Sequence, residues 1–232
     1  MLNYLYIIGN YPIIVYNFDN LDFSRHIQHY TDAPITRHLL LEILKEYKRP
    51  NDKISEWIKS GKLILLKRGM YVPGPTSELP MPSFFLIANQ LRGPSYVSLE
   101  SALSYWGCIP ERTYEVSSVT VKPSKRYKTP IGRFDYQQIP TPYYSYGIRR
   151  VQLKANQFAL IASPEKALCD KIVLTAGINL RSIRQTKDFL LEDLRMEEQV
   201  LPTLDREMIS SWLEDAPKKN SLQMLVSTLK EI

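Results

Sequence analysis

Apolar and polar residues alternate most regularly in the stretch PNDKISEWIKSGKLILLKRGMYVPG, which begins at residue 50. Ile54, Trp57 and Ile58 recur at the i, i+3, i+4 spacing of one helical face, with charged residues between them. This pattern predicts a short amphipathic helix. We expect Asn51 or Asp52 to cap its start, because Asx side chains accept hydrogen bonds from the first backbone N–H groups of a helix.

Two apolar runs follow this helix, Leu63–Leu66 and Met70–Val72, and both are too short to be helices. Lys67, Arg68 and Gly69 join them, and a glycine at the end of so short a turn is typical of a β-hairpin. The pattern therefore predicts a hairpin with a basic tip. A helix followed by such a hairpin is the second half of a winged helix-turn-helix, a fold in which the helix enters a DNA groove and the wing touches the backbone.

A further helix is expected before this stretch. Leu40, Ile43, Leu44 and Tyr47 recur at i, i+3, i+4 and i+7, and the Thr31-Asp32 pair is a suitable helix start. The two predicted helices form the helix-turn-helix pair.

The same patterns give a domain organisation and an α+β fold class. We expect an N-terminal extension over residues 1–30, a winged helix-turn-helix domain over residues 31–76, and a mixed C-terminal domain over residues 82–232. The proline-rich segment VPGPTSELPMP would separate the last two.

The C-terminal domain is expected to combine a small antiparallel sheet with a helical C-terminal tail. Helices are expected at residues 83–91, after Ser98 as an N-cap, after Ser163, and from residue 180 onward. The strands are expected at Glu115–Val121, Ile131–Ile139, Ile148–Lys154 and Gln157–Ile161.

The first 18 residues are apolar and uncharged, but Gly9-Asn10 and Pro12 interrupt them and the first basic residue is Arg25. They are too short and too polar to span a bilayer, and they lack the positive start of a secretory signal. We expect a strand or an extension on the body of a cytoplasmic protein with no membrane partner. The two cysteines, Cys108 and Cys169, are expected to be reduced.

Charge adds one observation to this picture. The 232-residue chain has a formal net charge of +6, and 44% of its residues are hydrophobic, as in ordinary globular proteins. Between Pro34 and Pro75 nine basic residues stand against four acidic ones, so nearly all of the net charge lies in the predicted winged helix. Localised positive charge favours a DNA backbone as partner. A basic solvated face on a winged helix that binds protein is the alternative.

A second basic patch, interleaved with Tyr127 and Phe134, lies between the predicted strands. It consists of Lys122, Lys125, Arg126, Lys128 and Arg133. Such a pattern suits a nucleic acid or an acidic partner surface, but a solvated inter-strand loop explains it equally well.

Catalytic and metal-binding signals are weak. His26 and His29 have a spacing that could hold a metal, but no third ligand is evident, and surface histidines explain them better. No histidine follows His38, which argues against Ser-His catalysis in the second half of the chain. We therefore expect no metal ion, no cofactor and no catalytic residue.

A nuclease or nucleotide-processing enzyme with a winged helix that presents the substrate remains the alternative function. Its nearest candidate residues are Glu100, Glu165, Lys166 and Asp170.

Three segments in series resemble AbiEi-type antitoxins, the transcriptional regulators of type IV toxin–antitoxin and abortive-infection systems. These segments are ISEWIKSGKLILLKRGMYVPG, YVSLESALSYWG and ASPEKALCDKI, which together span about residues 35–175. The resemblance fades in the first 30 residues and beyond residue 180.

The resemblance implies a winged helix that binds inverted repeats in its own promoter and represses it. It also implies a C-terminal domain that counteracts a nucleotidyltransferase-type toxin without a stable complex. The DNA-contacting residues implied are Lys53 and Lys59 on the recognition helix, Lys62, Lys67 and Arg68 at the wing, and Arg49 and Asn51 at the helix entrance.

Overall fold

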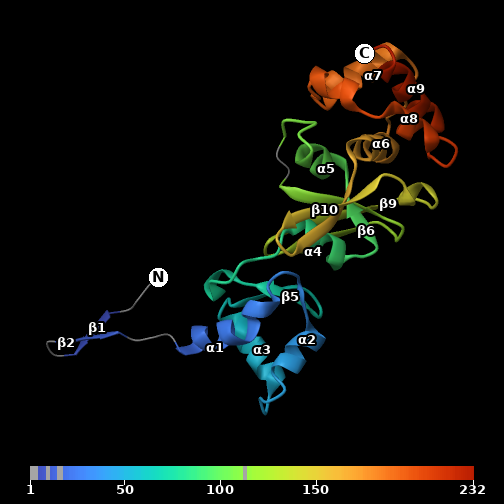
Figure 1. The fold of residues 1–232 in the computed structure, drawn as a ribbon. Coiled ribbons are helices and arrows are strands. Elements are labelled where there is room, and N and C mark those ends of the chain that lie inside the picture. The colour runs from blue at the N-terminus through green and yellow to red at the C-terminus, as the bar shows by residue number, and fades with distance from the viewer. Residues whose placement is uncertain (1–4, 9–10, 15–17, 112–113) are drawn as a thin grey trace. The chain divides into compact units, whose positions relative to one another are not determined.

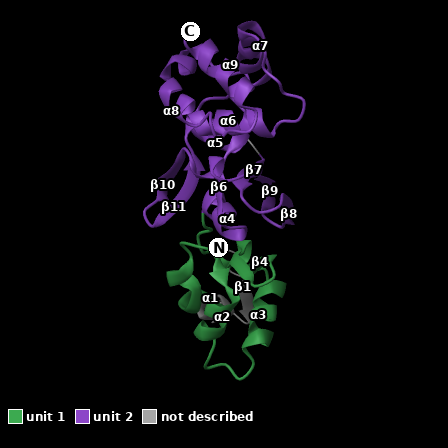
Figure 2. Ribbon diagram, turned by 90° about the vertical axis from the view of Figure 1, so that its right-hand side faces the viewer, with its two compact units in different colours: residues 1–82 green, residues 83–232 purple. Residues whose placement is uncertain are grey.

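The computed structural model describes residues 5–8, 11–14, 18–111 and 114–232, with side chains from Phe23 onward. The chain divides into two compact units, Met1–Pro82 (unit 1) and Ser83–Ile232 (unit 2), which Figure 2 shows in different colours. Among the described residues, none of the helices is both long enough and apolar enough to cross a bilayer.

Unit 1 combines short helices with a three-stranded antiparallel sheet in the order β3-β5-β4 (Figure 1). Its helices are α1 (Phe18–Ile27), α2 (Arg37–Ile43) and α3 (Pro50–Lys59), with 3₁₀ turns at Gln28–Tyr30 and Pro75–Ser77. Its strands are β1 (Leu5–Ile8), β2 (Tyr11–Ile14), β3 (Ile35–Thr36), β4 (Leu63–Lys67) and β5 (Met70–Pro73).

The expectation for the first 18 residues can be compared only in part. Strands β1 and β2 pair with each other as an antiparallel hairpin. Residues 1–4, 9–10 and 15–17 lie outside the described residues.

The core of unit 1 forms around Trp57 of α3. Phe23 of α1 meets Trp57 edge-on at a ring-centroid distance of 4.9 Å, and both side chains are fully buried together with Ile27. Burying side chains of this size stabilises a fold by about 1.5–3 kcal/mol each. The compact body of unit 1 therefore includes part of the stretch that the sequence assigned to an extension before residue 31.

Helix α2 begins later than the sequence predicted. Ile35 and Thr36 form β3, which pairs with Tyr71 and Met70 of β5. The Thr36 hydroxyl then accepts a hydrogen bond from the backbone N–H of Leu39 at 3.2 Å and caps the helix. The predicted start at Thr31-Asp32 is wrong because strand pairing takes the residues immediately before this cap.

The predicted hairpin is confirmed. Strands β4 and β5 pair antiparallel, with a register shift between Leu65 and Lys67, and a turn of Arg68 and Gly69 joins them. Gly69 has a φ of +81°, a left-handed conformation that favours glycine.

Unit 2 contains the larger sheet and the C-terminal helices (Figure 1). Its helices are α4 (Phe84–Leu91), α5 (Leu99–Tyr105), α6 (Pro164–Leu174), α7 (Ile183–Asp188), α8 (Arg206–Ser211) and α9 (Lys219–Leu229), with a π-helical segment at Phe189–Asp193 and 3₁₀ turns at Tyr143–Ser145 and Glu198–Thr203. Its strands are β6 (Ser95–Val97), β7 (Glu115–Thr120), β8 (Lys125–Thr129), β9 (Gly132–Gln138), β10 (Ile148–Lys154) and β11 (Gln157–Ala162).

The α+β class and the helical C-terminal tail are confirmed, whereas the small antiparallel sheet predicted for the second half is wrong. The sheet has six strands in the order β10-β11-β6-β7-β9-β8 and is mixed, since β11 pairs parallel with β6 and β7 pairs parallel with β9. Strands β6 and β8 were not predicted from the sequence. Strand β6 has only three residues and β8 consists mainly of basic residues, so neither shows an alternation of apolar and polar residues.

Helices cover both faces of this sheet. Helix α4 packs on β6, β7 and β11, and the Tyr136 hydroxyl of β9 donates to the Ala88 carbonyl of α4 at 2.6 Å. Figures 1 and 2 show α5 and α6 on the opposite side of the sheet. Helices α8 and α9 pack on α6 in turn.

Gly147 marks a close approach between the start of β10 and α6. It has a φ of +60°, and a Cβ atom there would lie 2.6 Å from the Lys166 Cβ and 2.8 Å from the Trp212 ring. Gly177 has a similar φ of +80°, but a Cβ there would meet nothing within 4 Å. The two positions therefore separate backbone strain from steric overlap.

We predict that Gly147→Ala lowers the free energy of unfolding by more than Gly177→Ala in chemical denaturation. Gly177→Ala, the control, should lower the free energy of unfolding by about 1–2 kcal/mol, because alanine is strained in a left-handed backbone conformation. Gly147→Ala should lower it by about 1–3 kcal/mol more, because the added methyl group also overlaps its neighbours. Equal losses in the two variants would contradict the close contact at Gly147.

Candidate nucleic-acid interface

Arg37, the first residue of α2, connects the three elements of unit 1 that the sequence associates with DNA. Its backbone N–H donates to the Gly69 carbonyl at the hairpin tip, at 2.9 Å. Its guanidinium donates to the Asn51 Oδ1 at the start of α3, also at 2.9 Å. The starts of both helices and the tip of the hairpin are therefore held together at one end of the unit.

This contact corrects the predicted role of Asn51 and Asp52 as helix caps. The residue before α3 is Arg49, no side chain caps the helix, and Pro50 occupies its first turn. The Asn51 amide oxygen is instead turned toward Arg37. Arg37 is one of the nine basic residues between Pro34 and Pro75, but nothing in the spacing of the chain signals its contact with α3.

Several other cations lie next to this meeting point. Lys67 and Arg68 immediately precede Gly69, and Arg68 is exposed. Arg49 immediately precedes α3, with a side chain 79% exposed and only 3.8 Å from the carboxylate of Asp52. Of the predicted contact residues, the structure thus brings Arg49, Asn51, Lys67 and Arg68 to one end of unit 1.

Lys53 is oriented differently from the prediction. Its ammonium forms an ion pair with Glu56 at 2.9 Å, one turn along the same helix, and its side chain is only 16% exposed. It also lies 5.9 Å from the Trp57 ring centroid and 6.0 Å from that of Tyr47. Lys53 therefore covers the aromatic core of unit 1 and presents little charge to solvent.

Lys59 and Lys62 lie away from the meeting point. Lys59 is exposed at the last turn of α3, eight residues after Asn51, which is about 12 Å along a helix axis. A basic residue there also complements the helix dipole. Lys62 is 6% exposed, so its predicted place among the exposed wing contacts is wrong. It begins the connection to β4, and its carbonyl accepts from the Gly74 N–H at 2.7 Å.

The exposed face of α3 is mixed in charge. Asp52, Ser55, Glu56 and Lys59 lie along it, and together with Ser60 they line a shallow depression. Elsewhere in the unit Lys45 pairs with Glu42 at 2.9 Å and lowers the pKa of that carboxyl. The predicted contact cations that lie near the hairpin tip and the helix starts are therefore Arg49, Lys67 and Arg68.

The second basic patch is an edge strand and not the loop that the sequence allowed. Lys125, Arg126 and Lys128 belong to β8, at one edge of the six-stranded sheet, and Lys122 precedes it. Arg133 of β9 is directly opposite Lys128. Lysines on edge strands block pairing with other chains, which accounts for the basic and aromatic alternation without a nucleic acid.

The charges of this patch are divided. Arg126 pairs with Asp135 at 3.2 Å and is 3.9 Å from Glu115. Lys125 directly precedes Arg126 on the strand, so its side chain points to the opposite face of the sheet. The Lys125 ammonium lies 4.9 Å from the centroid of the Tyr127 ring. Successive strand residues point to opposite faces, so the patch does not form one cationic surface.

Lys166 and Asp170, two residues of the alternative enzymatic interpretation, form a buried ion pair in unit 2. Both side chains are 0% exposed and the Lys166 Nζ lies 2.6 Å from the Asp170 Oδ1. The Tyr143 ring centroid is 3.5 Å from the same ammonium. The pair is enclosed and internally satisfied, which suits a structural role and not one in contact with substrate.

Ser98 also belongs to this network. It was predicted as the N-cap of α5, but its side chain makes no capping hydrogen bond there. Its hydroxyl donates to the Asp170 Oδ2 at 2.7 Å, and the Tyr96 hydroxyl donates to the same oxygen at 2.9 Å. Ser98 does occupy the N-cap position of α5, as predicted, but the buried carboxylate attracts its hydroxyl away from the helix end.

Glu165 and Glu100 lie at separate places. Glu165 is 4% exposed, accepts from the Asp205 N–H at 3.2 Å, and is 3.8 Å from Arg149. Glu100 pairs with Lys171. The four candidates for a catalytic cluster therefore do not converge on one open site.

His26 and His29, whose spacing could hold a metal, each lie next to another polar side chain. His26 Nε2 is 3.5 Å from the Tyr47 hydroxyl, and His29 Nε2 is 3.2 Å from the Gln28 amide. Within residues 5–8, 11–14, 18–111 and 114–232, no group of three His, Cys, Asp or Glu side chains is placed to hold a metal ion.

Both cysteines are free and buried in unit 2. Burial and the nearby Glu165 raise the pKa of the Cys108 thiol from 9.0 to about 11. Burial raises the pKa of Cys169 further, although Lys166 opposes the rise. Neither thiol is ionised near neutral pH, and only the thiolate is an effective nucleophile.

We predict that Asp170→Asn lowers the free energy of unfolding by about 3–5 kcal/mol in chemical denaturation, because the Lys166 ammonium is left buried without its counter-charge. The double variant Lys166→Met with Asp170→Leu should be more stable than Asp170→Asn, since it removes both charges. Asp188→Asn, at an exposed position of α7, is the control. A loss for Asp170→Asn no larger than the control's would refute the paired arrangement.

We also predict that iodoacetamide modifies neither cysteine of the folded chain at pH 8 over a period that fully modifies the unfolded chain. The raised thiol pKa values keep both groups protonated, and burial excludes the reagent. Mass spectrometry of intact protein with and without guanidinium measures the difference. Modification of the folded chain at the unfolded rate would show that these thiols are accessible.

Among known proteins, the chain is similar to a solved structure but matches no protein family by sequence. No family model and no curated protein matches the chain. Among solved structures, the chain is similar to the Rv2827c protein from Mycobacterium tuberculosis, with 16% sequence identity and a TM-score of 0.59. The match covers 90% of this chain and 77% of that chain. At this identity, what the two proteins share is a fold.

Proposed function

We propose that the protein is a DNA-binding transcriptional autorepressor and the antitoxin of a type IV toxin–antitoxin pair. In this proposal unit 1 is a winged helix-turn-helix domain. Helices α2 and α3 form the helix pair, the β4–β5 hairpin is the wing, and the partner is double-stranded DNA with inverted repeats.

The contact of Arg37 with both Asn51 and Gly69 is the observation that supports this proposal most strongly. It places the N-terminal end of α3 beside the wing tip, as a recognition helix in a groove and a wing on the backbone require. Because the guanidinium is already held by Asn51, its planar fork is oriented before binding.

The surrounding cations suit the phosphate backbone. Arg49, Lys67 and Arg68 adjoin the meeting point, and the N-terminal end of α3 adds the positive end of a helix dipole. Phosphate contacts supply most sequence-independent affinity, whereas Arg and Asn side chains are the types that read guanine and adenine edges. We assign phosphate binding to the first group and base contact to Arg37 and Asn51.

The antitoxin part of the proposal rests on the resemblance of the three sequence segments to AbiEi-type antitoxins. One of those segments supplies Lys166 and Asp170, and another supplies Tyr96 and Ser98. The hydrogen bonds among these four residues join the two segments. In this proposal the opposition to a nucleotidyltransferase-type toxin resides in unit 2, which contains this network.

We predict that Lys67→Glu combined with Arg68→Glu weakens binding to the duplex upstream of the protein's own gene and to unrelated duplex alike. The slope of log K against log salt concentration should fall in magnitude by about 2, one for each lost phosphate contact. Fluorescence anisotropy over a salt series measures both quantities.

The matched control is Arg184→Glu with Lys230→Glu, which makes the same charge change at exposed positions of unit 2. It should leave the slope unchanged. Equal effects of the two double variants would mean that total charge, and not the wing, governs binding. Absence of binding by the unmodified protein would favour a winged helix that binds protein.

A further inference from the structure

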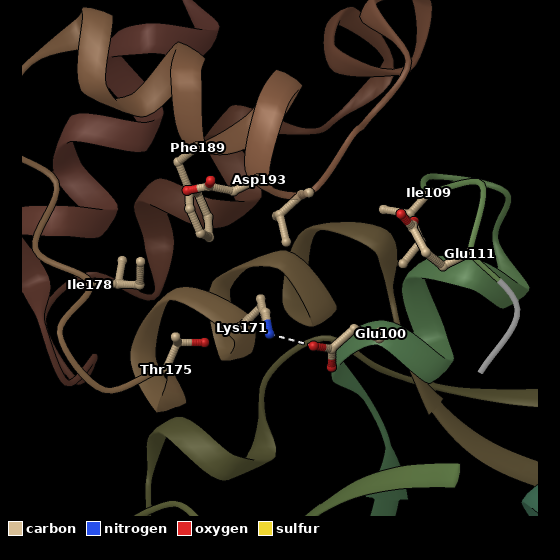
Figure 3. Close-up of a pocket in the computed structure, with 9 residues that line it drawn as sticks. Glu100, Ile109, Glu111, Lys171, Thr175, Ile178, Phe189 and Asp193 are labelled. Carbon is tan, nitrogen blue, oxygen red and sulfur yellow. Dashed lines mark hydrogen bonds and ion pairs between the residues drawn. The ribbon is translucent and has the colours of Figure 1, made fainter. Parts of the chain in front are cut away.

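Unit 2 contains a pocket of about 370 Å³ that the proposed DNA-binding function does not use. Figure 3 shows that its lining comes from separate stretches of the chain: the region of α5 and the loop after it, the C-terminal half of α6, and the π-helical segment Phe189–Asp193. A volume of this size lies within the range of about 300–1,000 Å³ that small-molecule sites occupy.

The inner wall of the pocket is apolar. Ile109, Phe189 and Leu194 line it and are 7%, 5% and 7% exposed. Ile178 contributes a further apolar side chain at another edge (Figure 3). An apolar group that entered the pocket would therefore lose its contact with water against preformed hydrocarbon surface.

Carboxylates flank this apolar wall. Glu100, Glu111 and Asp193 line the pocket, whereas Lys171 is its only cationic lining residue among those described. Lys171 pairs with Glu100, and Glu111 pairs with Arg195. Counting Arg195 together with Lys171 against the three carboxylates, the pocket carries one more negative than positive charge, although the chain as a whole has a net charge of +6.

Two features of the carboxylates favour an additional cation. The Glu111 Oε2 is buried and has no hydrogen-bond partner among the described residues. Asp193 is exposed at the opposite side of the pocket, on the π-helical segment. Such segments are rare and are often found at functional sites, and here the Leu194 N–H donates to the Phe189 carbonyl at 3.0 Å, five residues back.

We propose that this pocket binds a small organic cation, namely an apolar body that carries a protonated amine. The apolar body would contact Phe189 and Leu194, and the ammonium would lie beside the Asp193 carboxylate, with Glu111 adding negative charge at the other side of the pocket. A small molecule fits better than a macromolecule because the apolar surface is recessed between the three stretches of chain. This inference does not depend on DNA binding by unit 1.

Three indole compounds that differ mainly in the charge of the side chain test this proposal on the full chain. They are tryptamine, tryptophol and indole-3-propionate, which are cationic, neutral and anionic at neutral pH. Isothermal titration calorimetry should show binding of tryptamine, about tenfold weaker binding of tryptophol because an ion pair is lost, and no binding of indole-3-propionate.

Variants locate the binding site. Asp193→Asn should weaken tryptamine binding about five- to tenfold, and Ile178→Arg, which places a cation at the pocket's edge, should abolish it. Glu192→Gln removes the adjacent, exposed carboxylate that does not line the pocket and should leave binding unchanged. Circular dichroism confirms that each variant is folded.

Three results would overturn the proposal. They are no binding of tryptamine at millimolar concentration, equal affinity for the three indoles, or tryptamine affinity that folded Asp193→Asn and Ile178→Arg variants leave unchanged. None of these results would bear on the DNA affinity of unit 1, which is measured separately.

Discussion

The burial of Trp57 and Ile54 determines which face of α3 is exposed on the surface of unit 1. These side chains fix the rotation of α3 against α1 and the small sheet, because the face that carries them must point inward. Asn51 then lies at the exposed start of the helix, within reach of Arg37. The hydrogen bond from Arg37 to Gly69 adds the hairpin tip to the same end. A hydrophobic constraint thus sets the position of the polar residues to which we assign DNA binding.

The basic residues of unit 1 are not equally exposed. Nine basic residues between Pro34 and Pro75 look like one cationic surface in the sequence. In the structure Lys53 is paired within its own helix and Lys62 is buried, whereas Arg49 and Arg68 remain exposed near Arg37. For the proposed DNA binding, the relevant quantity is therefore the number of cations at the β4–β5 turn and the helix starts, and not the net charge of the unit.

Some local patterns predicted local structure correctly, although the predicted start of α2 and the predicted cap of α3 were wrong. The apolar face of α3, the β4–β5 hairpin and the Ser163 cap of α6 follow from short-range rules of spacing and capping, and all three are present. The mixed order of the large sheet could not be predicted, because pairing between β7 and β9 depends on tertiary contacts. The roles of Arg37 and Ser98 were missed for the same reason: their partners lie 14 and 72 residues away.

The central claim is that the end of unit 1 where Arg37, Asn51 and Gly69 meet is the surface that contacts duplex DNA. Amide chemical-shift mapping of the full chain, titrated with the duplex upstream of its own gene, tests this claim most directly. The account predicts that the largest shifts fall on the starts of α2 and α3 and on the β4–β5 turn. Shifts concentrated on β8 or elsewhere in unit 2, with those three places unaffected, would contradict it.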